Sequence, residues 1–274
     1  MDQLTANLIA SVPILTLLFG GLVLMLMDAF KRQRWLGSIA AGTLLLSSFL
    51  ALPLEGFPQG ANEQTFFSGM IRFGGFASLV HIFLSLSALF ALFFVRPYLE
   101  RMGKHISEVY SLLVFAVIGM ILLANAADLI ILFIGLEMMS LCLYIMAALF
   151  KGDIRSNEAG LKYFLLGAFA TGFLLYGIAL LYGLAQSTQL DVIREAIFTP
   201  DPEASITTNL MFLPAVALIL IGFLFKLAAF PFHSWTPDVY TGSPTPLAGF
   251  MATGSKMAAF IALSFFVLKA VPAA

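Results

Sequence analysis

The chain has 274 residues, of which 61% are hydrophobic and 11% are charged. Soluble domains carry about a quarter of their residues as charged side chains, so this composition excludes an ordinary water-soluble protein. The 14 Lys and Arg against 15 Asp and Glu give a net charge of -1, which excludes a basic surface for nucleic acid. The single cysteine, Cys142, excludes an internal disulfide framework and a cysteine metal site.

Runs of about 20 apolar residues recur along the whole chain, and this length crosses a hydrocarbon core of about 30 Å as an α-helix. The runs lack the strict alternation of barrel strands, so they predict an all-α polytopic membrane protein with about eight transmembrane helices. In chain order the expected spans are Leu8–Met27, Trp35–Leu54, Gly75–Val95, Val109–Ala124, Asp128–Phe150, Ala159–Tyr182, Leu210–Phe230 and Pro246–Lys269.

Cations concentrate in alternate loops, and short cytoplasmic loops carry an excess of Lys and Arg. The opposite loops hold only Arg72 and Arg194, so we expect the N-terminus outside. The longer outer loop after the sixth span, residues 190–198, interleaves apolar and charged residues and predicts a short helix lying in the interface. The cations expected on the cytoplasmic side are Lys31, Arg32, Arg34, Arg96, Arg101, Lys104, Lys151 and Arg155.

Three ionisable residues lie inside the spans, where each costs at least about 2.5 to 3.5 kcal/mol and requires a partner or a wet cavity. Glu137 is near the middle of the fifth span, Lys226 is in the inner half of the seventh and Lys256 is central in the eighth. Each shares a helical stripe with polar or small residues, which aims it at one helix face. The stripes are Ser140 and Tyr144 with Glu137, Gly222 and His233 with Lys226, and Gly249, Thr253 and Ser264 with Lys256.

A static buried ion pair that only fixes helix packing is the simpler interpretation of these charges, although such pairs are weak evidence for stability. We favour a proton or ion pathway, because intramembrane ionisable residues usually mark one. Glu137 cannot neutralise both Lys226 and Lys256, so burial favours proton release from at least one lysine.

Other titratable residues are interpreted as structural. His81, alone near the start of the third span, is expected to be a packing histidine rather than a member of a proton relay. Glu108, Asp128, Glu158 and Lys162 lie at span ends, where water or lipid headgroups reach them.

The seventh span runs into FKLAAFPFHSWTPDVYTGSPTP, residues 225–246, which contains four prolines. Pro231 has no N–H to donate and its ring clashes with the preceding turn, so the helix is expected to kink or stop just after Lys226. Unwound backbone at membrane depth is tolerated only where protein buries it or water lines it, and transporters place it beside ion paths. A proline kink that serves packing alone is the alternative.

A short second helical piece is predicted beyond this break. It starts with Thr236 as N-cap and Pro237 at the first helical position, and it ends at Gly242. Ser243 or Thr245, each followed by proline, is expected to cap the eighth span.

Three stretches of the chain resemble a known family. They are ISEVYSLLVFAVIGMILLANAADLIILFIGLEMMSLCLY (106–144), SNEAGLKYFLLGAFATGFLLYGIALLYG (156–183) and FKLAAFPFHSWTPDVYTGSPTPLAGFMATGSK (225–256). These stretches look like the antiporter-like membrane subunits of the proton-pumping NADH:quinone oxidoreductase, respiratory complex I, and most like subunit N, the counterpart of mitochondrial subunit 2. Subunits L and M and the Mrp-type cation/proton antiporter subunits share the glutamate, the lysines and the broken helix.

The resemblance implies a fold with two inverted five-helix repeats, each with a discontinuous helix. It implies a three-helix segment at 1–105, the first proton-channel repeat at 106–269 and a truncated end at 270–274. Glu137 resembles the fifth-helix glutamate, Lys226 its lysine partner and Lys256 the central lysine that relays protons towards the second half. His233 matches a histidine near the break. The second repeat and its exit-side lysine are missing, so we expect a fragment; a second chain that supplies the other half is the alternative.

The expected function is proton translocation in the membrane arm of NADH:quinone oxidoreductase, through a relay of Glu137, Lys226, Lys256 and His233. A subunit of an Mrp-type cation/proton antiporter and a structural scaffold subunit are the alternatives. No cofactor is expected in this chain, because it provides no haem, iron–sulfur or dinucleotide ligands. The resemblance implies NADH, FMN, iron–sulfur clusters and quinone on other subunits. It also implies partners of the antiporter-like M and small K and J types, and a bacterial inner membrane.

Overall fold

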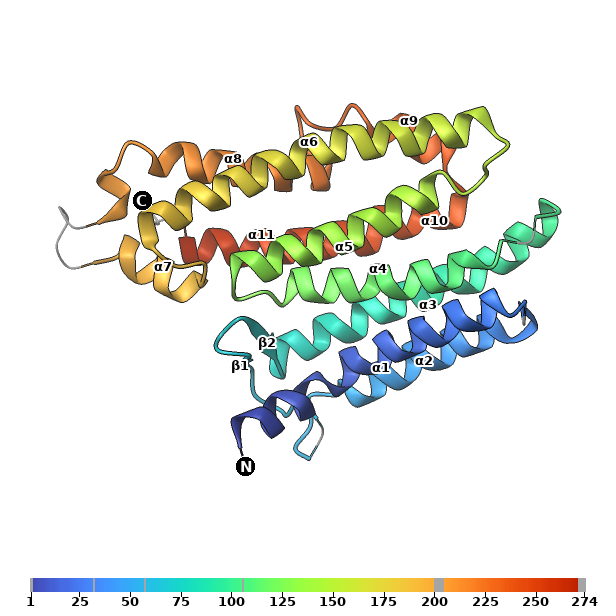
Figure 1. Ribbon diagram of the computed structural model, residues 1–274, viewed down its shortest axis with the longest axis horizontal. Coiled ribbons are helices and arrows are strands. Elements are labelled where there is room, and N and C mark those ends of the chain that lie inside the picture. Colours follow the sequence, from blue (N-terminus) through green and yellow to red (C-terminus); the bar gives the residue numbers. More distant parts are fainter. Residues whose placement is uncertain (1, 32, 57, 105, 200–204, 271–274) are drawn as a thin grey trace.

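The computed structural model describes residues 2–31, 33–56, 58–104, 106–199 and 205–270. Residues 271–274 of the expected truncated end lie outside the described residues, as does Arg32. Long helices run side by side along the molecule (Figure 1). Their bounds are α1 Gln3–Ala29, α2 Leu36–Leu50, α3 Gly75–Arg101, α4 Glu108–Ala124, α5 Leu129–Ala147, α6 Ile154–Ala185, α8 Phe212–Leu227, and the continuous segment of α10 Thr245–Phe250, the π-helical turn η3 Met251–Ser255 and α11 Lys256–Ala270.

The eight predicted spans are confirmed as helices within the described residues. Five of these helical segments are long and apolar enough to cross a membrane, and three shorter apolar helices, α2, α4 and α8, complete the set. Two of the helices begin at aspartates: Asp128 accepts a hydrogen bond from the Ile130 N–H, and Asp153 from the Arg155 N–H. Such side chains satisfy backbone donors that the first helical turn leaves free.

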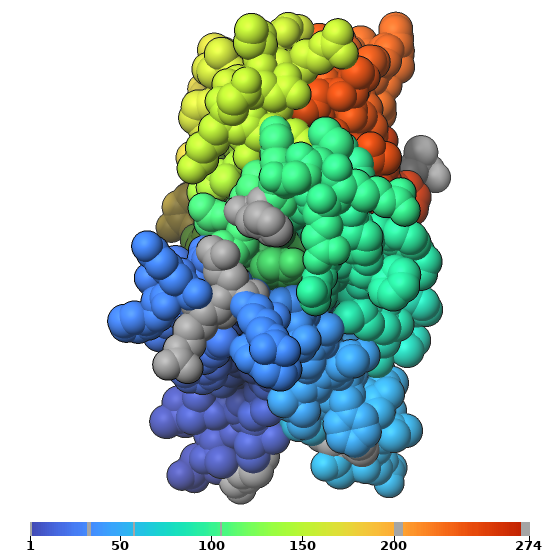
Figure 2. Space-filling model, turned by 90° about the vertical axis from the view of Figure 1, so that its right-hand side faces the viewer, coloured from blue at the N-terminus to red at the C-terminus, as the bar shows by residue number. Residues whose placement is uncertain are grey.

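Shorter elements lie in the connections between the long helices. They are η1 Gln33–Trp35, the strands β1 Gln64–Phe66 and β2 Ile71–Phe73, α7 Leu190–Ile197, η2 Ile206–Thr208 and α9 Thr236–Gly242. The connections from α1 to α2, α3 to α4 and α5 to α6 lie at one end (Figures 1 and 2). These connections and the adjoining helix ends hold the cations expected on the cytoplasmic side. The β1–β2 hairpin and α7 lie at the opposite end (Figure 1).

The central helix of the bundle is α4, which packs against α1, α2, α3, α5 and α11. Its closest neighbour is α5, because a glycine on each helix faces the other backbone. A Cβ added to Gly119 would lie 2.4 Å from the Met139 nitrogen, and one added to Gly135 would lie 2.4 Å from the Leu123 nitrogen. Small residues allow this backbone contact, which fixes α5 firmly against the middle of the bundle.

The β1–β2 hairpin was not expected, and Arg72 of β2 fastens it to the helices. Arg72 donates to the carbonyls of Ala124 and Ala126 at 3.1 and 3.2 Å, and its guanidinium carbon lies 3.3 Å from the centroid of the Phe265 ring. Burial lowers the pKa of this guanidinium from 12.5 to about 10, while Glu63 and Asp191 act in the opposite direction. Arg72, which itself lies outside the spanning helices, therefore joins the hairpin to the α4–α5 turn and to α11.

Several local expectations were wrong. The N-cap of α9 is Trp235, with Thr236 already inside the helix, and α10 follows Pro244 with no side-chain cap. The Ser243 hydroxyl instead donates to the Val239 carbonyl at 2.6 Å. By contrast, the short helix expected within residues 190–198 is present as α7, and its apolar face packs against α11 and the core. Its buried residues are Leu190, Ile193 and Ile197.

Replacing Gly119 with Ala is expected to force α4 and α5 apart, since the new methyl group has no space between the two backbones. Overpacking of this kind costs about 1 to 3 kcal/mol. We expect a lower Tm of the full chain in detergent. Gly172→Ala on α6 is the matched control, because a Cβ there meets nothing within 4 Å. Equal Tm values for the two variants would contradict the close helix contact.

Candidate functional site

Lys226 lies at the last turn of α8 with only 2% of its surface exposed. Its Nζ donates to the Ser140 hydroxyl at 2.9 Å and to the Tyr163 hydroxyl at 3.1 Å. Ser140 gives its own proton to the Leu136 carbonyl, so Ser140 can only accept from Lys226. Among the described residues no carboxylate forms an ion pair with this amine. The group is a membrane-buried amine held by neutral oxygens.

Two tyrosine rings surround the same amine. Lys226 Nζ lies 5.7 Å from the centroid of Tyr144 and 5.1 Å from that of Tyr163, distances at which a ring face attracts a cation. The two rings meet edge to face at 4.7 Å. Tyr144 comes from α5 and Tyr163 from α6, so three helices converge on one charge.

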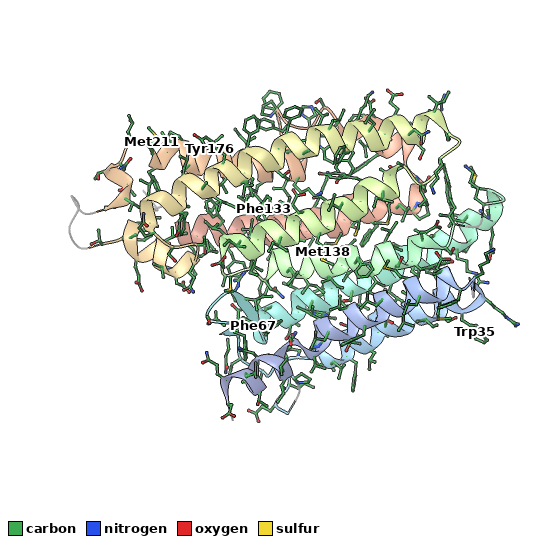
Figure 3. The ribbon with its side chains drawn as sticks, viewed as in Figure 1. Trp35, Phe67, Phe133, Met138, Tyr176 and Met211 are labelled. Carbon is green, nitrogen blue, oxygen red and sulfur yellow. The ribbon has the colours of Figure 1, made fainter. Side chains whose placement is uncertain are left out.

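Glu137 lies on α5, less than one turn before Ser140, and its side chain is half-buried. Its Oε1 atom is buried and has no hydrogen-bond partner among the described residues. The next residue, Met138, lies about midway along the bundle (Figure 3). The structure therefore brings Glu137 close enough to Lys226 for their charges to interact, yet leaves the pair open.

The helix break follows Lys226 as predicted, because α8 ends at Leu227 and Ala228 takes a left-handed conformation with φ 56. The chain then returns so that the Trp235 Nε1 donates to the Phe225 carbonyl at 3.2 Å. This bond satisfies a carbonyl near the end of α8 and holds the Trp235 indole against the last turn of that helix. Trp235 stacks on Tyr163 with centroids 4.6 Å apart and planes 10° apart.

Lys256 begins α11 directly after the π-helical turn, and its side chain is half-buried. Its Nζ lies 5.7 Å from the centroid of Tyr240, a residue of α9. The stripe expected to aim Lys256 at the interior does not do so, because Gly249 and Thr253 are exposed. The π-helical turn shifts the register between Thr253 and Lys256 and separates the lysine from them.

His233 is the sequence-predicted site residue that the structure does not bring to the others. It is exposed on the connection between α8 and α9, with its ring 5.8 Å from that of Phe230. It cannot continue the stripe of Lys226 and Gly222, because α8 ends six residues before it.

Several residues that the sequence analysis interpreted as structural form hydrogen bonds or ion pairs with other parts of the chain. His81 is fully buried and its Nε2 lies 2.8 Å from the Ser47 hydroxyl. Asp128, expected at a solvated end, is 1% exposed and accepts from Thr188 at 2.6 Å as well as capping α5. Lys162 on α6 pairs with Glu158 and with Asp238 of α9, each at 2.6 Å.

Sequence reasoning missed Tyr163, Trp235 and Tyr240, whose contacts with one another link the two lysines. Their signal was weak, because an aromatic residue in an apolar helix usually packs against other helices or lipid. All three appeared in the sequence analysis only as unremarked letters of the quoted motifs. Across the described residues, no group of three His, Cys, Asp or Glu side chains is placed to hold a metal ion.

The comparisons with known proteins fit this architecture. The family described as NADH:quinone oxidoreductase/Mrp antiporter, TM, matches residues 126–273, more than half of the chain. NADH-quinone oxidoreductase subunit N of Salinibacter ruber is 41% identical over 92% of this chain and 49% of that protein. The protein of the same name from Trichlorobacter lovleyi is 40% identical over 98% of this chain and 54% of that protein. The chain spans about half the length of the curated relatives it matches.

Two solved structures share the fold. A chain of respiratory complex I from Thermus thermophilus with bound aureothin has a TM-score of 0.76 and 33% identity, over 93% of this chain and 53% of that one. A chain of the membrane-bound sulfane sulfur reductase, an archaeal respiratory membrane complex, has a TM-score of 0.67 and 19% identity, over 94% and 52%, and is evidence for the fold alone. This chain is a multipass membrane protein that belongs to the NADH:quinone oxidoreductase/Mrp antiporter family of transmembrane subunits.

Proposed function

We propose that the chain is a proton-translocating part of the membrane arm of an NADH:quinone oxidoreductase, and that it couples quinone reduction to proton transfer through Glu137, Lys226 and Lys256. The observation that carries the proposal is the buried Lys226 amine, held by two hydroxyls beside an unpaired Glu137 in the described part of the chain. An intramembrane amine is costly, and packing alone would be better served by an apolar residue.

The proposed mechanism alternates two arrangements of Glu137 and Lys226. When the two are paired, the carboxylate stabilises the ammonium form of the lysine. When they separate, desolvation disfavours the ammonium, and its proton moves on towards Lys256. In this proposal, the open arrangement of Glu137 and Lys226 would correspond to the separated state. Movement of neighbouring subunits would drive the exchange.

The remaining assignments extend the same proposal. Residues 106–269 would form one proton-channel repeat, and residues 1–105 a supporting three-helix segment. His233 remains a candidate only if the connection between α8 and α9 rearranges, because the side chain is exposed. The chain's own residues would handle protons only, while NADH, FMN, iron–sulfur clusters and quinone would be bound by other subunits. The partners would be membrane subunits of the M, K and J types.

The proposed setting is a bacterial inner membrane with the N-terminus outside. The cation-rich connections, all at one end of the bundle, would face the cytoplasm. A second candidate function, a subunit of an Mrp-type cation/proton antiporter, is favoured by one observation: the matching family includes both classes. Both candidate functions use the same buried charges.

Replacing Lys226 with Met in the assembled complex tests the amine itself. The side chain keeps similar volume, so assembly is expected to persist, because an apolar residue fits this buried site. The rate of proton pumping is expected to fall by at least about tenfold, a modest part of the 10² to 10⁴ that a positioned proton-transfer group supplies. Protons pumped per NADH and assembled complex are measured together, with exposed Lys151→Met as control. Undiminished pumping and turnover would refute the proposal.

Replacing Glu137 with Gln distinguishes a proton pathway from a scaffold. The amide keeps the shape but cannot stabilise the Lys226 ammonium, so pumping is expected to fall while assembly stays near normal. Exposed Glu195→Gln on α7 is the matched control. A scaffold role predicts the reverse for Glu137→Gln: less assembled complex, with normal pumping in what does assemble.

A further inference from the structure

The hydroxyl of Tyr240 is buried and makes no hydrogen bond among the described residues. Buried polar groups without partners are rare in folded proteins, and such a group commonly marks a bound water or a functional role. The ring does not require the hydroxyl for its packing, because a phenylalanine would make the same ring contacts. Nothing in the proposed pairing of Glu137 with Lys226 uses this group.

Tyr240 lies between the two membrane lysines. On one side, Lys256 Nζ is 5.7 Å from its ring centroid. On the other side, its ring meets Trp235 edge to face at 6.1 Å, and Trp235 stacks on Tyr163. Tyr163 in turn accepts a hydrogen bond from Lys226. Two tyrosines thus flank one tryptophan, and each tyrosine contacts one of the two lysines.

Two contacts at the N-terminal end of α9 hold this arrangement in place. The Trp235 indole is tied to the Phe225 carbonyl, just before Lys226. Asp238, two residues before Tyr240, pairs with Lys162 of α6 at 2.6 Å. An exposed pair of this kind adds little stability, but it sets the position of α9 against α6. Tyr240 therefore has a fixed ring and a hydroxyl without a partner in the described chain.

We propose that the Tyr240 hydroxyl is the proton relay between Lys226 and Lys256; this inference rests on the proposed function. In the transfer, the Lys226 ammonium gives a proton to a bridging water, and that water gives one of its protons to the Tyr240 oxygen. The Tyr240 O–H bond breaks as its proton bonds to the neutral amine of Lys256. Water and tyrosine are regenerated, Lys226 becomes neutral and Lys256 becomes an ammonium. No phenolate forms.

The neighbouring groups suit both ends of this transfer. A hydroxyl is both donor and acceptor, so Tyr163 can accept from the Lys226 ammonium and, after rotation of its O–H alone, donate to the neutral amine. Lys256 has a flexible four-carbon stem and no hydrogen bond among the described residues. From its place 5.7 Å from the ring centroid, the amine would reach the Tyr240 hydroxyl by rotation of that stem, while the ring face attracts the ammonium that results.

The test is Tyr240→Phe in the assembled complex, compared with Tyr176→Phe, a tyrosine of α6 that is 60% exposed. The change removes one oxygen that makes no hydrogen bond to the described residues. The amount of complex, its Tm and the KM for quinone are therefore expected to remain unchanged, or the Tm to rise. The rate of proton pumping is expected to fall by at least about tenfold, because the positioned proton carrier is lost. The control should match the parent protein.

The outcomes separate this inference from the proposed function. Normal pumping in Tyr240→Phe together with its loss in Lys226→Met would overturn the relay and leave the proposed function standing. Normal pumping in both variants would overturn the proposed function as well. Loss of pumping in proportion to lost assembly or a lowered Tm would assign Tyr240 to packing and would also overturn the relay.

Discussion

A buried amine whose nearest hydrogen-bond partners are hydroxyls is the constraint on which the rest of the site depends. The Lys226 amine donates to two neutral hydroxyl oxygens and lies over two tyrosine rings. No carboxylate forms an ion pair with it in the described chain. A full ion pair would stabilise one protonation state, whereas hydroxyls accept from the ammonium and one of them can donate to the amine. The site is therefore suited to a lysine that changes charge, and less suited to one that only holds helices together.

The fold was largely predictable because the bilayer sets the length of a spanning helix and Pro231 limits how far α8 can continue. The eight spans and the end of α8 after Lys226 follow from those two rules. Cap residues were predicted less well, since the Ser243 hydroxyl bonds back to the Val239 carbonyl, a choice that depends on local geometry. The β1–β2 hairpin is three residues a side, too short to leave a pattern, and its anchor Arg72 depends on contacts far along the chain.

Of the candidate site, only the charged residues could be predicted from the sequence. Glu137, Lys226 and Lys256 were found because a charge inside an apolar run is costly and is seldom retained without a function. Their surroundings were not found, since a tyrosine in an apolar helix carries no mark of the direction in which its hydroxyl points. The π-helical turn before Lys256 is likewise invisible in a spacing argument, because it breaks the period on which that argument relies. His233 shows the opposite failure: adjacency to the break suggested a role, yet the chain turns it outward.

The close contact of α4 and α5 decides which part of the Glu137–Lys226 pair is free to move. Gly119 lies against the Met139 nitrogen and Gly135 against the Leu123 nitrogen, so two backbone contacts bracket Glu137 within α5. Lys226, on α8, is held by its two hydrogen bonds to Ser140 and Tyr163. Sliding of α5 would have to break a packed backbone interface, whereas rotation of the half-buried carboxylate about its side-chain bonds needs no such loss. Under the proposed function, a neighbouring subunit would therefore act at least cost on the Glu137 side chain itself, and proton release from Lys226 would depend on where that one carboxylate points.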